Sequence, residues 1–330
     1  MEIKNNFNLI RVVLSIFVVL SHSYPVAGLP EPTYFYMSAG MLAVHGFFAI
    51  SGYLITRSFE RSPRVLSFAW NRLLRIAPGL VVAYLFSKFA YKAFDGYAGN
   101  PLVLLNASLW TLPWEMLCYV AVGLVGVVGA LNRNTFPALY CSLWFIFIMH
   151  LGDDGRLFYF VTAMLMMFLT GAFIALAEHR LSVPKAALAA VFVMLVVFTQ
   201  TGIDALSALV KVADFAYGPK FPIGGIRQAL YVAALSFIFI YLSVYAVRVP
   251  FFKDDISYGV YVYAWPVQEI VVKLMADHGL APGGLSVFLL SMPPIVLLSW
   301  ISWRLIEKPA LGMKKLLAIR KTQVTHQIRS

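Results

Sequence analysis

Charged residues are scarce in this sequence. They make up 12% of the 330 residues, whereas soluble domains average about a quarter. Hydrophobic residues make up 61% of the chain, and apolar segments about long enough to cross a bilayer recur along its whole length. This composition excludes an ordinary soluble domain. It predicts an all-α polytopic membrane protein with about ten transmembrane helices.

Cysteines and metal-ligand patterns are also sparse. Cys118 and Cys141 are the two cysteines, and both fall in apolar segments, which favours packing over a disulfide framework. The 6 histidines are scattered, and no HExxH or CxxC pattern occurs, so no metal site is predicted. No internal repeat or long polar stretch is evident. We therefore expect one integral-membrane domain over 1–330, with a core at 9–311 and a basic cytoplasmic tail at 308–330.

Acidic residues are fewer than basic ones, 15 against 26, which gives a formal net charge of +11. Such an excess can indicate nucleic-acid binding, but here it follows the expected topology. If the chain starts in the cytoplasm, most lysines and arginines fall on the cytoplasmic side, as the positive-inside rule requires. We expect both termini inside, contact with membrane lipids and no nucleic-acid partner. The predicted spans are 9–27, 37–57, 76–95, 110–131, 136–151, 157–178, 185–202, 227–247, 256–276 and 285–305.

The first predicted span carries the most informative pattern. In RVVLSIFVVLSH, positions 11 to 22, an apolar run has an arginine at one end and a histidine at the other. Eleven residues make almost three helical turns, so Arg11 and His22 share one face about 16 Å apart along the axis. Ionisable groups at membrane depth are functional candidates by default. An imidazole can move a proton in acyl transfer; the alternative is a structural histidine bonded to a neighbouring helix.

A pair of arginines extends this pattern on the cytoplasmic side. Arg72 and Arg75, in NRLLRIAP, are three residues apart and would point the same way on a helix. Together with Arg64 and Arg11 they would form a basic mouth suited to phosphates, which arginine binds in bidentate fashion. The alternative is that they only follow the positive-inside rule.

A glutamate is the candidate partner of the histidine. Glu115 follows Pro113, a residue that suits a first helical turn, which places the carboxylate at the outer start of its span, at the depth of His22. There it would hold the imidazole tautomer, as the third member of a triad does. The alternative is a glutamate stabilised by the positive end of its own helix.

Small and aromatic residues supply the remaining candidates. Ser51, next to Gly52 in HGFFAISGYLIT, lies where a ligand or another backbone can come close, so we include it among the donor-binding residues. It lacks the context of a nucleophile elbow. Tyr258 and Trp265 would line an acceptor path or pack helices, and Trp110 would line that path or belong to an interfacial aromatic belt.

Two further expectations concern the surface. Glu307 is expected to pair with Arg304 at the inner surface, as residues three apart on a helix do. The segment 204–228 is expected to be a lid or an ordinary outer loop.

The ordered set of motifs resembles the acyltransferase-3 family of bacterial integral membrane enzymes. The motifs are RVVLSIFVVLSH, FFAISGYLIT, NRLLRIAP, SLWTLPWEMLCY, ISYGVYVYAWPV and EKPAL, over about residues 9–311. The resemblance implies ten core helices in the bacterial cytoplasmic membrane. It also implies transfer of an acyl group, commonly acetyl, from cytoplasmic acyl-coenzyme A (here acetyl-CoA) to a sugar hydroxyl of a lipid-linked, exported or cell-surface glycan.

The same resemblance assigns roles to individual residues. Arg11 and His22 match the family's essential pair, and Arg72 and Arg75 match its donor-binding arginines. Ala264 stands where a histidine is common, and His45 stands where an acidic or amide residue is more often seen. Many relatives carry a soluble SGNH domain, which we do not expect here.

These elements predict a tunnel from a charged inner entrance to His22. The histidine would act as a general base on the acceptor hydroxyl; a transient acyl-histidine is the alternative. A competing hypothesis is a transporter or flippase that uses His22 and Glu115 as a proton relay. A third is a non-catalytic scaffold for glycan assembly. A homo-oligomer is left open.

Overall fold

The computed structural model describes most of the chain. The described residues are 5–34, 37–61, 63–94, 106–150, 156–197, 223–247, 249 and 254–314. Most of the predicted outer segment, up to residue 222, and the tail from residue 315 lie outside them. All structural statements below refer to the described residues.

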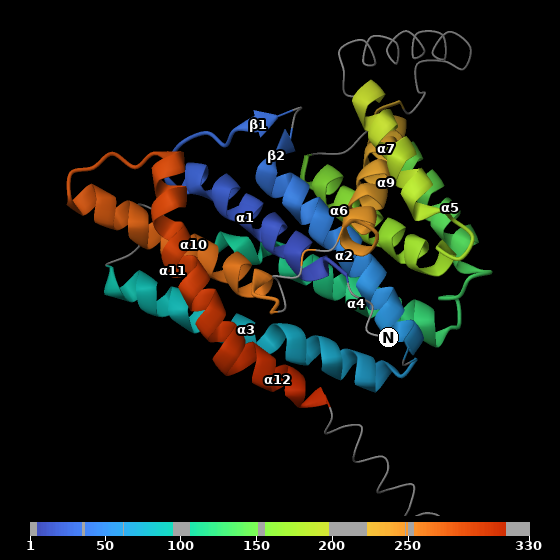
Figure 1. Ribbon diagram of the computed structural model, residues 1–330, viewed down its shortest axis with the longest axis horizontal. Coiled ribbons are helices and arrows are strands. Elements are labelled where there is room, and N and C mark those ends of the chain that lie inside the picture. The colour runs from blue at the N-terminus through green and yellow to red at the C-terminus, as the bar shows by residue number, and fades with distance from the viewer. Residues whose placement is uncertain are drawn as a thin grey trace, which may run out of the picture. The chain divides into compact units, whose positions relative to one another are not determined.

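These residues fold almost entirely into helices (Figure 1). The long helices are α1 (Phe7–Val26), α2 (Ala39–Arg61), α3 (Val65–Ala93), α4 (Leu112–Val127), α5 (Phe136–His150), α6 (Arg156–Ala177), α7 (Val183–Val197), α9 (Ile223–Val244), α10 (Ser257–Asp277) and α11 (Gly284–Ser302). Shorter elements are the 3-10 helix η2 (Ala107–Thr111), the π-helical turn η3 (Trp303–Glu307) and α12 (Lys308–Gly312). Strands β1 (Thr33–Tyr34) and β2 (Met37–Ser38) form one antiparallel pair. Each predicted span overlaps one long helix.

Six helical stretches are long and apolar enough to cross a membrane: Phe7–Val26, Ala39–Arg61, Val65–Ala93, Ala107–Val127, Phe160–Ala177 and Gly284–Gly312. Phe136–Met149, Val183–Met194 and Gln228–Val244 are shorter apolar helices. A multi-pass membrane protein follows from these lengths and compositions. The number of ten spans and the cytoplasmic side of the termini stay predictions.

The chain divides into two compact units. The first unit comprises Met1–Ile10, Val44–Arg61 and Trp114–Val249. The second unit comprises Arg11–Ala43, Ser62–Pro113 and Pro250–Ser330. Each unit is described by itself below.

Helices α2 and α6 of the first unit meet at glycines. A Cβ atom on Gly52 would overlap the backbone carbonyl of Phe168, and one on Gly171 would overlap that of Ala49. Small residues at such a crossing let two membrane helices approach closely. The helix crossing that the sequence left as an alternative at Gly52 is therefore what the structure contains.

We expect Gly52→Ala to destabilise the protein. The new methyl group meets backbone, which cannot rotate away, and overpacking of this kind costs about 1–3 kcal/mol or more. Thermal unfolding of the detergent-purified protein would measure the loss. Gly123→Ala in α4 is the matched control, because nothing lies within 4 Å of a Cβ atom there and alanine favours a helix over glycine. Equal melting temperatures for the two variants would contradict this packing.

Helix α10 is the buried centre of the second unit. Every residue from Ser257 to Glu269 is buried, and α10 packs against α11 and α3 (Figure 1). Helix α1 also packs on it, because Val19 shares a hydrophobic cluster with Val260 and Ala264. The amide of Gln268 donates a hydrogen bond to the Val19 carbonyl at 2.6 Å. These contacts hold α1 against α10 within the second unit.

Candidate functional site

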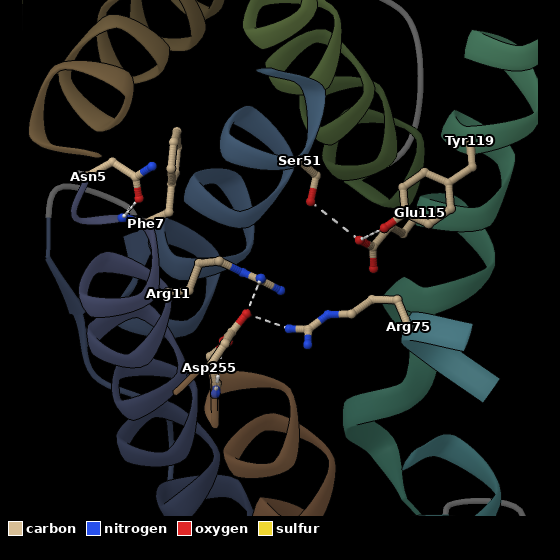
Figure 2. A network of polar contacts seen from close by, with 9 residues as sticks. Asn5, Phe7, Arg11, Ser51, Arg75, Glu115, Tyr119 and Asp255 are labelled. Carbon is tan, nitrogen blue, oxygen red and sulfur yellow. Dashed lines mark hydrogen bonds and ion pairs between the residues drawn. The ribbon is translucent and has the colours of Figure 1, made fainter. Parts of the chain in front are cut away.

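One carboxylate binds two arginines in the second unit. Oδ2 of Asp255 lies 2.5 Å from Nη1 of Arg11 and 2.5 Å from Nη2 of Arg75. Figure 2 shows both guanidinium groups turned toward this oxygen. The three side chains are largely buried, with exposed fractions of 21% for Arg11, 15% for Arg75 and 11% for Asp255. We call this group the arginine clamp.

Three helices position the clamp. Arg11 lies in the second turn of α1, Arg75 lies in α3, and Asp255 precedes the first turn of α10. Ser257 holds the other carboxylate oxygen of Asp255, donating from its hydroxyl at 2.5 Å and from its backbone N–H at 3.3 Å. The guanidinium carbon of Arg75 lies 5.7 Å from the centre of the Trp303 ring, where a cation–π contact is favourable. Ser257 therefore orients Asp255, and Trp303 contacts Arg75.

The position of Arg75 corrects one prediction. The predicted third span begins at residue 76, which places both arginines just before it. Helix α3 instead begins at Val65, so Arg72 and Arg75 are helical. Pro78 lies inside this helix. The predicted three-residue spacing of the two arginines is therefore a helical spacing.

Asp255 is charged under all ordinary conditions. Burial by itself raises the pKa of this carboxyl group, but the charges of Arg11 and Arg75 and the hydrogen bonds from Ser257 outweigh it and lower the pKa to about 2. A carboxyl group with a lowered pKa stabilises the fold above its ordinary value near 3.8, and this contribution disappears as the pH falls toward 2. The clamp thus carries a permanent negative charge between two permanent positive ones.

Two more cations lie at this end of the second unit. The guanidinium carbon of Arg72 is 5.7 Å from the centre of the Phe68 ring. Burial, followed by the positive charges of Arg72 and Arg75, lowers the pKa of Lys314. Since those charges act on Lys314, it is one more cation beside these two arginines, and the predicted basic mouth did not include it.

Glu307 is buried, and its predicted pairing with Arg304 is wrong. Its Oε1 accepts a hydrogen bond from the Ser302 hydroxyl at 3.1 Å, and its exposed fraction is 1%. Arg304 instead lies over the ring of Trp300, at 5.1 Å. The π-helical turn η3 changes the spacing of side chains, so the three-residue rule of an α-helix does not apply there.

His22 lies further along α1, in the same unit. Its Nδ1 atom is 3.4 Å from the Ser108 hydroxyl, and its ring meets the Trp265 ring edge-on, with centroids 5.4 Å apart. His22 is partly exposed, whereas Ser108 is fully buried. Both Arg11 and His22 belong to the continuous helix Phe7–Val26, which confirms their helical spacing.

Ser108 is itself held by a polar network. The Asn106 side chain caps η2 by accepting from the Ser108 N–H at 3.1 Å, as asparagine commonly does at this position. The same side chain donates to the Val262 carbonyl of α10 at 2.7 Å. Tyr261 donates to the Ser108 carbonyl, and its hydroxyl also bonds Thr111 at 2.7 Å. The contact of Ser108 with His22 is therefore tied to η2 and α10.

Glu115 and Ser51 meet within the first unit. The Ser51 hydroxyl donates to Oε1 of Glu115 at 3.3 Å, and Tyr119 donates to the same oxygen (Figure 2). Glu115 lies in the first turn of α4, as predicted. It belongs to the first unit and His22 to the second, so their pairing stays a prediction.

The aromatic candidates have different surroundings. The Tyr258 hydroxyl donates to the Ile76 carbonyl at 3.1 Å, a contact that fits the packing alternative. Trp265 is buried against His22 and shares a cluster with Val26. Trp110 is 39% exposed. The acceptor-lining role of all three stays a prediction.

Sequence reasoning missed Asp255, Ser108 and Lys314. Asp255 is 244 residues from Arg11 along the chain and 180 from Arg75, so no local pattern joins them. The Asp-Ile-Ser sequence just before α10 was the available signal, since aspartate commonly bonds the backbone at the start of a helix. Asn106, two residues before Ser108, gave a similar signal for η2.

Comparison with known proteins gives matches over nearly the whole chain. The family described as Acyltransferase domain (Acyl_transf_3) matches residues 4–304. An O-acetyl transferase of Shigella phage Sf6 is 30% identical over 93% of this chain and 96% of its own length. Nodulation protein 10 of Rhizobium leguminosarum bv. viciae is 30% identical over 37% of each chain. No solved structure matches significantly.

Proposed function

We propose that this chain, which belongs to the Acyl_transf_3 family of acyltransferases, is a membrane O-acetyltransferase that uses acetyl-CoA. The acceptor would be a sugar hydroxyl of a lipid-linked or exported glycan, and the location the bacterial cytoplasmic membrane. The name of the phage relative supports an acetyl group and an oxygen acceptor. The family and the apolar helices support a membrane enzyme.

The observation that carries the proposal is the pair of sites on α1. Arg11 near the start of the helix belongs to a buried basic cluster, and His22 lies eleven residues later with a polar partner of its own. Coenzyme A has phosphates at one end and a thioester at the tip of a flexible arm. With its phosphates on the arginines, the arm would run along α1, and the thioester would lie near His22.

His22 would act as the general base. It would take the proton of the sugar hydroxyl, whose oxygen attacks the thioester carbon. The carbon–sulfur bond then breaks, and the imidazolium returns the proton to the coenzyme A thiolate. The Ser108 hydroxyl can accept from Nδ1–H, and in that tautomer Nε2 is the basic nitrogen. Glu115 is proposed to stabilise the imidazolium. A transient acyl-histidine is the alternative chemistry.

The direct test is turnover of acetyl-CoA by the purified protein in lipid nanodiscs. We expect release of free coenzyme A that increases when a glycan extract is added, with acetyl label appearing on the glycan. A transporter or a scaffold would release none. Absence of both thioester turnover and coenzyme A binding would therefore contradict the proposal. Mass spectrometry of surface glycans from cells with and without the gene would then identify the sugar.

A further inference from the structure

The arginine clamp poses an electrostatic problem that Asp255 solves. Arg11 and Arg75 come from two different helices, yet each has a terminal nitrogen 2.5 Å from the same oxygen. Two guanidinium groups this close repel each other, and more so in a largely buried place where water screens them little. A buried counter-charge removes that repulsion and fixes both side chains in one arrangement.

The contacts with Asp255 use only part of each guanidinium group. A guanidinium group has five N–H donors in a planar fork. Asp255 contacts one terminal nitrogen of each side chain, Nη1 of Arg11 and Nη2 of Arg75. An incoming phosphate would be bound by N–H donors other than the two that Asp255 holds, and the carboxylate would stay in place. The charges of Arg72 and Arg75 act on Lys314, which adds a further cation near the clamp.

Asp255 is itself fixed before any ligand arrives. Both contacts from Ser257 go to Oδ1, which leaves Oδ2 directed at the arginines. Because the carboxylate is already oriented, the arginines are held without loss of side-chain freedom at the moment of binding. The neighbouring Asp254 is more exposed, at 34%, and it pairs with Lys308 at 3.1 Å.

We propose that Asp255 is a positioning residue of the donor site, which holds Arg11 of α1 and Arg75 of α3 so that both bind the phosphates of acyl-coenzyme A. This inference rests on the proposed function. It adds a residue outside the arginine motifs and assigns it a role in donor affinity, with no direct contact to the donor.

The test is Asp255→Asn, which removes the charge but keeps the size and one hydrogen-bonding oxygen. We expect the KM for acetyl-CoA to rise about tenfold, as the loss of one charge-assisted hydrogen bond produces, with kcat at saturating donor little changed. S-acetylpantetheine, a thioester that lacks the nucleotide phosphates, serves as the second donor. Its kcat/KM should not change, whereas a general loss of structure would lower it too.

Asp254→Asn is the matched control. It removes the same charge from the adjacent residue, and we expect its KM for acetyl-CoA to equal that of the wild type. If Asp255→Asn does not fold, as judged by thermal unfolding, Asp255→Glu takes its place, because it keeps the charge and displaces it by one methylene. A raised KM for acetyl-CoA alone is expected there as well.

Two results would overturn the inference. An unchanged KM for acetyl-CoA would show that Asp255 is not needed to orient the arginines. A lowered KM would show that the carboxylate competes with phosphate for them. Both are read against wild-type protein that turns over acetyl-CoA; wild-type protein that neither binds nor turns over acetyl-CoA would instead count against the proposed function.

Discussion

His22→Ala is expected to abolish acyl transfer while leaving donor binding intact. Loss of a general base lowers rates by about 10²–10⁴-fold, and an acyl-histidine route would lose its nucleophile entirely. The rate of label transfer from acetyl-CoA measures the loss of acyl transfer. Calorimetry of coenzyme A binding measures whether donor binding is intact. Transfer from S-acetylpantetheine should fall equally, because the histidine acts on the thioester end of both donors.

Two controls isolate the imidazole. His278→Ala removes an exposed histidine whose Nδ1 lies 2.8 Å from the Leu274 carbonyl at the end of α10, and we expect it to retain full activity. Ser108→Ala removes the hydroxyl beside His22 and should give an intermediate rate. Near-normal transfer by His22→Ala would remove His22 from the chemistry.

The fold was largely predictable because apolar runs dominate this chain. Each predicted span overlaps a helix, since a long apolar run with few charges favours one. The start of α3 was missed by 11 residues, Val65 instead of 76, because polar and basic residues at 71–75 have the composition of a connection. Two contacts accompany their place in a helix: Arg75 forms a tertiary ion pair with Asp255, and Arg72 lies against the ring of Phe68, one turn earlier in the same helix.

The candidate site was predictable only where it is local. Arg11 and His22 were recognisable because one helix carries both at a countable spacing. Asp255 was not, because its partners are 180 and 244 residues away and only packing of α10 brings them together. Glu307 shows the opposite error, in which a local α-helical rule failed at a π-helical turn.

Arg72→Ala combined with Arg75→Ala is expected to raise the KM for acetyl-CoA by about 10²-fold. Each substitution removes a charge-assisted contact that contributes roughly a factor of ten. The KM for S-acetylpantetheine should stay the same, because that donor has no nucleotide phosphates. Raising the salt concentration should weaken donor binding to the wild type more than to the variant, since ionic contacts are screened.

The matched control decides between phosphate binding and membrane topology. Arg61→Ala combined with Arg133→Ala removes the same charge from two exposed side chains, Arg61 at the end of α2 and Arg133 between α4 and α5. If the arginines of α3 bind the donor, this control keeps the wild-type KM. If both pairs raise the KM equally, the basic residues act only through membrane topology and through the overall positive charge of the protein. The donor site must then lie elsewhere, because removing Arg72 and Arg75 would have no effect beyond their charge.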